Sequence, residues 1–297
     1  MASTHPAAAP ALIPSAPGPG RGDRAIKRFV NNQLALIGLM ILVAMVAVAI
    51  GASLVTPYAP DEISYEFLAQ PSAGHPLGTD DVGRDELSRL IYASRVSLTV
   101  GVCVSVITVL IGVLVGTAAG YYGGRVDAWM SGGINVLLSI PMIPLAMVLG
   151  AFLKTTLLFV VLILGALSWT GVARIIRAEF LSIREREFVT AARVLGASDL
   201  RIIARHILPN TVPSIIVAAT LQVAAAILAE SALSYLGYGI QPPTASWGNM
   251  LQNAQRFFRI YPMLAIYPGA LVSLTVIDIN FVGDGLRDAL DPRLKHL

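Results

Sequence analysis

The chain has 297 residues, of which 55% are hydrophobic and only 13% are charged, and its mean hydropathy is +0.71. This composition excludes an ordinary soluble protein, because a bilayer core about 30 Å thick needs about 20 apolar residues per helical span and several stretches reach that length. The pI near 9.1 does not indicate nucleic-acid binding, since the basic residues gather beside the apolar stretches. The single cysteine, Cys103, excludes an internal disulfide and a thiolate metal cluster.

Residues 1–24 form an arm rich in Ala, Pro, Gly and Ser, a composition that predicts disorder. It does not resemble a signal peptide, because no basic region precedes a short apolar core. A basic cluster lies directly before the first apolar stretch and predicts that the N-terminus is cytoplasmic and that the first span is an uncleaved anchor. This cluster consists of Arg21, Arg24, Lys27 and Arg28.

Six membrane spans are predicted, so the expected fold class is an all-α polytopic membrane protein. With Lys154 in the short turn between the third and fourth spans, fifteen of the 21 Lys and Arg residues fall inside and six outside. This bias, which counts Arg174 as inner, predicts that both termini are cytoplasmic. The six predicted spans are residues 33–56, 96–121, 128–152, 155–175, 211–236 and 262–282.

The outer segments contain two groups of residues with alternative interpretations. The acidic residues before the second span could hold a cation, but helix capping and solvation are the preferred interpretation. In the last outer segment, Trp247 follows two prolines and is either an aromatic anchor of a rigid loop or an interfacial tryptophan. The residues in question are Asp80, Asp81, Asp85, Pro242 and Pro243.

Two features inside the spans predict how the helices pack. Three glycines at four-residue spacing in the second span let another helix approach closely, and internal packing is preferred over dimerisation. Pro141 and Pro144 remove backbone donors and should kink the third span, as occurs beside translocation pathways. The three glycines are Gly112, Gly116 and Gly120.

Glu230 in the fifth span and Asp278 in the sixth are costly residues in a hydrocarbon environment, so each should face the interior of the bundle. Two interpretations are open. The carboxylates are either ion relays of a secondary transporter or structural groups, and the structural interpretation is preferred. Because Glu230 is expected near the outer end of its span and Asp278 near the inner end, they should not pair.

The long inner segment 174–210 predicts two short amphipathic helices separated by Gly196, with Ser198 or Asp199 as the second cap and Pro209 as the end. A DNA-binding helix pair and a lipid-bound helix pair are the less favoured interpretations, and a docking element is the favoured one. The first helix has an expected apolar face formed by Phe188, Ala191, Ala192 and Leu195. The face of the second is formed by Leu200, Ile203, Ala204 and Ile207.

This segment resembles the EAA loop of permease subunits of binding-protein-dependent ABC importers. That pattern has an EAA triplet, three residues, Gly, nine residues and I-x-L-P. Thr190 replaces the Glu and His206 the Ile, which resembles the peptide/nickel branch of the family. The matching positions are Ala191, Ala192, Gly196, Leu208 and Pro209.

Three further stretches resemble permeases of the DppC/OppC type. They are HPLGTDDVGRDELSRLIYASRVSLTVG from His75, ESALSYLGYGIQPPTASWGNML from Glu230 and NFVGDGLRDALDPRL from Asn280. The resemblance covers nearly everything after residue 25. It implies a type I ABC importer permease fold, with residues 25–94 as basic flank, first span and external segment. Residues 95–284 would be the permease domain and 285–297 a cytoplasmic tail.

The resemblance also implies a function and a set of partners in the bacterial inner membrane. ATPase subunits would dock on the coupling helix, an extracytoplasmic solute-binding protein would deliver dipeptides or oligopeptides, and a second, homologous permease would complete a heterodimer. Because the chain has no G-x-x-x-x-G-K-[ST] phosphate loop, ATP and Mg²⁺ are expected on the ATPase, and the chain itself should be neither an enzyme nor a cofactor-binding protein. The alternative function is an ion-coupled secondary transporter that uses Glu230 and Asp278. The docking residues implied are Glu187, Ala191, Ala192, Gly196, Leu208 and Pro209.

Overall fold

A computed structural model describes residues 21–152 and 156–290, and in these ranges the chain is helical apart from its connecting segments and two isolated β-bridges. The helices at the N-terminal side are α1 (Arg21–Asn31), α2 (Gln33–Ile50), α3 (Ala52–Val55), α4 (Glu86–Tyr122), α5 (Gly124–Ser139) and α6 (Met142–Phe152). They are followed by α7 (Leu157–Arg184), α8 (Glu187–Val194), α9 (Asp199–Ile202), the π-helical turn η1 (Ile203–Ile207), α10 (Leu208–Tyr235), α11 (Trp247–Ala254), the 3₁₀ turn η2 (Gln255–Phe257) and α12 (Met263–Leu290).

The helices confirm the predicted spans. Five are long and apolar enough to cross a membrane, and α5 with α6 makes a sixth if this pair, bent by 78°, counts as one span. The bend falls at Ile140 and Pro141, where the proline has no N–H for the helix, so the predicted kink is confirmed. Pro144 lies in the first turn of α6, where a missing donor costs little. The predicted turn at Lys154 lies outside the described residues.

Several helix ends differ from the predicted span ends. Helix α4 begins at Glu86 and not at residue 96, and α7 continues to Arg184 beyond residue 175. In both cases polar turns extend the helix past the apolar window, because hydropathy reports the membrane thickness and not the hydrogen-bonded length. The first predicted span is shorter, since the helix breaks at Gly51 before α3.

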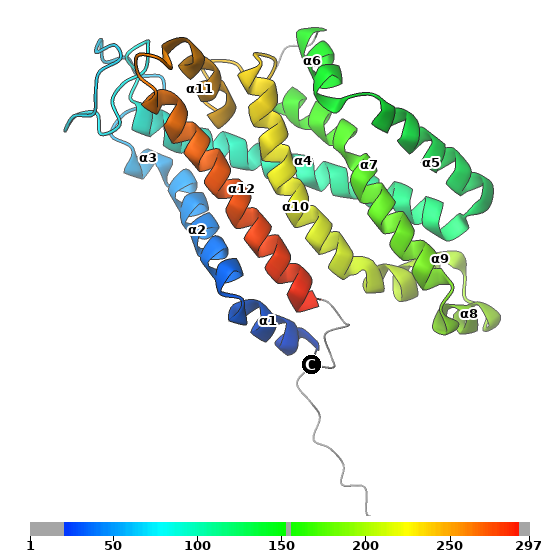
Figure 1. The fold of residues 1–297 in the computed structure, drawn as a ribbon. Coiled ribbons are helices and arrows are strands. Elements are labelled where there is room, and N and C mark those ends of the chain that lie inside the picture. The colour runs from blue at the N-terminus through cyan, green and yellow to red at the C-terminus, as the bar shows by residue number, and fades with distance from the viewer. Residues whose placement is uncertain (1–20, 153–155, 291–297) are drawn as a thin grey trace, which may run out of the picture.

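The spanning helices lie side by side, with polar elements gathered at their two ends (Figure 1). The segment between α3 and α4 lies with α11 at one end. Helices α8 and α9 lie at the opposite end, where α1 and the last turns of α12 are also found. The molecule therefore presents two ends that are separated by the length of the spans.

The glycines of α4 form a close helix contact. A Cβ built on Gly116 would lie 2.6 Å from the carbonyl oxygen of Ala173 in α7, and one on Gly120 would lie 2.6 Å from Cβ of Phe180. Gly112 meets Val172 in the same way, at 2.7 Å. The three glycines thus let α4 and α7 pack backbone to backbone, which confirms the prediction of internal packing.

Replacing Gly116 with Ala is expected to destabilise the protein by about 1–3 kcal/mol, because the added methyl group has no space beside the α7 backbone. The measurement is thermal unfolding of the purified protein in detergent. Gly171→Ala is the matched control, since no described atom lies within 4 Å of a Cβ at this helical glycine. Equal unfolding temperatures for the two variants would contradict the packing argument.

Candidate functional site

The tip at the α8 and α9 end of the molecule is built around one turn. Helix α8 begins at Glu187 and ends before Gly196, which has φ +80°. The N–H of Ala197 donates to the carbonyl of Ala192 (3.1 Å) and the N–H of Gly196 to that of Arg193 (3.0 Å), as in a Schellman cap. Gly196 therefore ends the first predicted helix, as expected. Among the described residues, no atom lies within 4 Å of a Cβ placed at Gly196.

The buried face of α8 differs from the predicted one. Val189 is fully buried and Ala192 is nearly so, whereas Phe188, Ala191 and Leu195 are exposed. The sequence contains two neighbouring apolar stripes on this short helix, and the C-terminal end of α7 covers the one that includes Val189. Helical spacing alone cannot decide between adjacent stripes, and of the predicted apolar face only Ala192 is buried.

The second predicted helix also differs from its prediction. Ile202 and Ile207 are buried and Ile203 is partly buried, but Leu200 and Ala204 are exposed. The π-helical turn η1 adds a residue to the turn, so Ile207, five residues after Ile202, lies on the same buried side. Pro209 does not end the helix. It lies in the first turn of α10, where its missing N–H is not needed.

Three large apolar side chains at the tip are strongly exposed. Val194 is 82% exposed, Leu195 87% and Leu200 76%. We call these three residues the apolar tip. Arg193 and Arg201 are exposed beside them. Sequence reasoning missed this feature because it placed Leu195 and Leu200 on apolar helix faces without deciding whether those faces are buried or exposed. An exposed apolar group of this kind, with basic neighbours, is typical of a protein–protein contact.

Polar contacts tie the tip to the ends of the spanning helices. The hydroxyl of Tyr121, at the end of α4, donates to Oδ1 of Asp199 (2.6 Å). Arg184 Nη1 donates to the carbonyl of Tyr121 (3.1 Å), and Arg177 of α7 forms an ion pair with Asp127 of α5. A displacement of the tip would therefore be passed to α4, α5 and α7.

Glu230 is fully buried within a group of hydroxyls at the other end of the spans. Ser234 Oγ donates to its Oε1 (2.7 Å), and Ser97 Oγ of α4 lies 3.4 Å from its Oε2. Ser97 Oγ in turn accepts the N–H of Trp247 (3.2 Å), the first residue of α11. Glu230 thus joins α4, α10 and α11, which favours the structural interpretation. Trp247 is fully buried, so it is an anchor and not an interfacial residue.

Asp278 is only 2% exposed, and its Oδ2 has no hydrogen-bond partner in residues 21–152 and 156–290. It lies near the middle of α12 and not one turn from its end, because α12 continues to Leu290. A Cβ added to Gly38 of α2 would lie 2.8 Å from the carbonyl oxygen of Asp278, so α2 packs closely here. No hydrogen bond joins the carboxyl groups of Glu230 and Asp278 in the described part of the chain, as expected.

The acidic residues before α4 are engaged in structural contacts. Asp85 caps α4 by accepting the N–H of Ser88 (2.8 Å), and it pairs with His75 (2.9 Å). Asp80 accepts the N–H of Arg84 (2.9 Å) and pairs with its guanidinium (2.7 Å). No group of three His, Cys, Asp or Glu side chains in the described part of the chain is arranged to hold a metal ion. The geometry therefore agrees with the capping interpretation.

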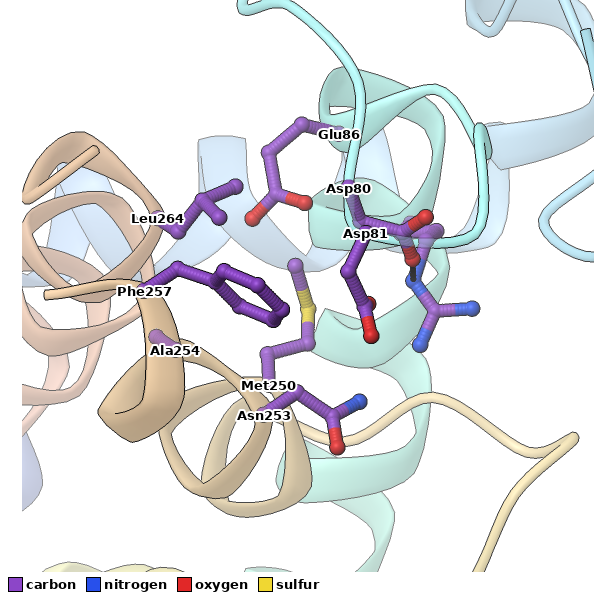
Figure 2. A pocket seen from close by; sticks show the side chains of 9 residues that line it. Asp80, Asp81, Glu86, Met250, Asn253, Ala254, Phe257 and Leu264 are labelled. Atoms are coloured by element: carbon purple, nitrogen blue, oxygen red, sulfur yellow. Dashed lines mark ion pairs between the residues drawn. The ribbon is translucent and has the colours of Figure 1, made fainter. Parts of the chain in front are cut away.

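A small pocket of about 10 Å³ lies between this acidic segment and the elements α11 and η2. Figure 2 shows Asp81 and Glu86 on one side of it and Met250 and Phe257 on the other. Its volume suits one water molecule and no larger solute. Nearby, the hydroxyl of Tyr261 donates to the carbonyl of Leu77 (3.1 Å). Burial, together with Tyr267 and Glu86, raises the pKa of Tyr261 above its ordinary value. The hydroxyl therefore stays protonated and remains a donor.

Comparison with known proteins identifies the family. Residues 112–296, more than half of the chain, match the family described as "binding-protein-dependent transport system inner membrane component". The chain belongs to this family. Residues 20–71 match the N-terminal transmembrane domain of oligopeptide transport permease C. The protein is thus a multi-pass permease subunit of an ABC importer in the inner membrane and not an enzyme, and an ion-coupled secondary transporter is not favoured.

Similar proteins cover nearly the whole permease. A peptide permease protein from Brucella suis is 40% identical over 95% of this chain and 94% of its own length. The dipeptide transport permease DppC of Alkalihalophilus pseudofirmus is 39% identical (91% and 90%), and the oligopeptide transport permease OppC of Mycobacterium tuberculosis is 37% identical (93% and 96%). A chain of the inward-facing MetNI methionine ABC transporter shares the fold, with a TM-score of 0.57, 20% identity and coverage of 69% of this chain and 97% of that one.

Proposed function

We propose that this permease forms half of a transmembrane pathway for the uptake of dipeptides or oligopeptides. A second, homologous permease would form the other half, and an extracytoplasmic solute-binding protein would deliver the peptide. The names of the similar permeases support the substrate class. The observation that carries the proposal is the apolar tip, because it offers a firmly held contact surface at one end of the spans.

ATPase subunits would dock on this tip and hold the ATP and Mg²⁺. Three exposed residues of the predicted docking set, Glu187, Ala191 and Gly196, would contact the ATPase directly together with the apolar tip. Ala192, Leu208 and Pro209 would position the tip, since Ala192 is buried in it and the other two begin α10. Through Tyr121 and Arg184, closure of the ATPase would pull on α4 and α7 and so alternate the pathway. The bend at Pro141 and Pro144 would lie beside that pathway.

The arrangement of the ends supports a cytoplasmic location for both termini. Helix α1 and the last turns of α12 lie at the same end of the molecule as α8 and α9 (Figure 1). If the ATPase docks on the tip, that end is cytoplasmic and α11 is external. The excess of Lys and Arg on the same side agrees with this orientation.

The test is transport by the assembled complex in vesicles. With the two permeases, the ATPase and the binding protein present, a radiolabelled dipeptide or short oligopeptide should accumulate only when ATP is supplied on the ATPase side. Dissipating the proton gradient should leave the initial rate unchanged, because hydrolysis drives the cycle. Uptake that persists without the ATPase and stops when the proton gradient is dissipated would contradict the proposal.

A further inference from the structure

The external segment between α3 and α4 carries an exposed apolar patch. Tyr65 is 83% exposed, Phe67 59%, Ile63 45% and Val82 38%. We call these four residues the outer patch. They gather near Gly83: a Cβ placed on this glycine would lie 3.3 Å from the backbone N of Tyr65 and 3.5 Å from the ring of Phe67. The segment lies at the end of the molecule opposite α8 and α9 (Figure 1).

The outer patch rests on an ordered platform, although the segment has no regular secondary structure. Both the N–H and the hydroxyl of Ser64 donate to the carbonyl of Gly83, at 2.9 and 2.8 Å. The N–H of Leu68 donates to the carbonyl of Asp80 (3.0 Å), and buried Thr79 bonds to both Glu66 and Ala69. These contacts hold the two halves of the segment against each other. The exposed rings are therefore presented with little freedom, which lowers the entropic cost of binding.

The backbone at the centre of the patch is strained. Tyr65 has φ +64° and Leu68 has φ +53°, in the left-handed region that side chains other than Gly and Asn rarely adopt. Such a conformation costs about 1–2 kcal/mol per residue and persists only when the surroundings enforce it. Here it holds the large side chain of Tyr65 in solvent, so burial of that side chain does not offset the cost of the backbone conformation. The strain thus points to a use for the exposed ring.

Carboxylates surround the outer patch. Asp61, Glu62 and Glu66 are exposed, and Asp81 is half-buried. The neighbouring basic residues Arg84 and Arg89 do not neutralise the negative charge of these carboxylates, because both are buried and pair with Asp80. An aromatic patch with an acidic rim is unfavourable against anionic lipid and complementary to a basic protein surface.

We infer that the outer patch is the anchor on which the solute-binding protein docks. Tyr65 and Phe67 would enter an apolar pocket of that protein, and lysines or arginines around the pocket would face the carboxylates of the rim. Aromatic anchors of this kind carry much of the binding energy of an interface, while rim charges mainly set the association rate. The inference rests on the proposed function and names the residues that serve it.

The test uses the complete complex in nanodiscs and the purified binding protein loaded with peptide. The double variant Tyr65→Asn, Phe67→Ser removes both rings, and Asn tolerates the left-handed backbone. Its Kd for the binding protein should rise by about tenfold or more, and stimulation of ATP hydrolysis should fall, while the basal rate of hydrolysis stays unchanged. The charge variant Glu62→Lys, Glu66→Lys should lower the association rate and weaken its dependence on salt.

Leu54→Ser is the matched control, because Leu54 is 90% exposed in α3 but lies outside the outer patch. It should leave the Kd unchanged. A Kd within about twofold of wild type for the double variant would overturn the inference. Two other results for the double variant would also overturn the inference. If it binds the binding protein normally but loses the second permease, the patch belongs to the contact with that subunit. If it binds normally but loses membrane association, the patch belongs to the contact with lipid. A wild-type complex that shows neither ATP-dependent uptake nor binding would refute the proposed function itself.

Discussion

Gly196→Trp is expected to abolish association with the ATPase while the permease still inserts into the membrane. Gly196 has φ +80°, a left-handed backbone conformation that costs an L residue with a Cβ atom about 1–2 kcal/mol. The indole would also project into the open space beside the apolar tip, where the ATPase is proposed to bind. The measurement is the amount of ATPase that co-purifies with the tagged permease, with uptake in vesicles as the second readout. Both should fall by more than about tenfold.

Two further variants separate bulk from strain. Gly196→Asn keeps a side chain that tolerates positive φ and should retain most of the ATPase. Leu195→Asp leaves the turn intact but places a charge in the apolar tip, so it should lose the ATPase as Gly196→Trp does. Wild-type recovery of the ATPase with both Gly196→Trp and Leu195→Asp would contradict the docking assignment.

The parts of the fold that depend on local chemistry were predictable from the sequence. Apolar length predicted the spans, the missing donor of Pro141 predicted the bend, and Gly196 predicted the end of α8. The cap at Asp85 was also predictable, because an acidic residue before an apolar helix commonly accepts its first N–H groups. Each of these features is decided within a few residues of the chain.

The features that depend on tertiary packing were not predictable in the same way. The choice of Val189 over Leu195 as the buried side chain of α8 is made by α7, which is distant in sequence. The π-helical turn η1 has no residue signature, and it changes the spacing of the buried side chains, so that Ile202 and Ile207 are buried while Ala204 is exposed. The sequence therefore located this short-helix segment correctly but did not predict which of its apolar side chains are exposed.

Glu230→Ala is expected to destabilise the α11 end of the permease and to abolish uptake. Removing the carboxylate leaves the hydroxyls of Ser97 and Ser234 without their acceptor in a fully buried site, at a cost of about 1–3 kcal/mol for each unpaired group. The cavity left by the side chain adds to this loss. The measurement is thermal unfolding in detergent, together with protease cleavage of residues 237–246, which should become faster because Ser97 also holds the N-terminus of α11.

Glu230→Gln distinguishes this structural role from an ion relay. The amide keeps the shape of the side chain and one acceptor oxygen for the serine hydroxyls, but it cannot exchange a proton. A structural role predicts that Glu230→Gln retains most of the stability and ATP-dependent uptake that Glu230→Ala loses. A relay predicts instead that Glu230→Gln is as inactive in transport as Glu230→Ala despite normal stability. Because Ser97 lies in α4 and Ser234 in α10, their hydrogen bonds to residue 230 connect two spans. A structural role requires only an acceptor at this position, so the neutral amide of Glu230→Gln should preserve the connection.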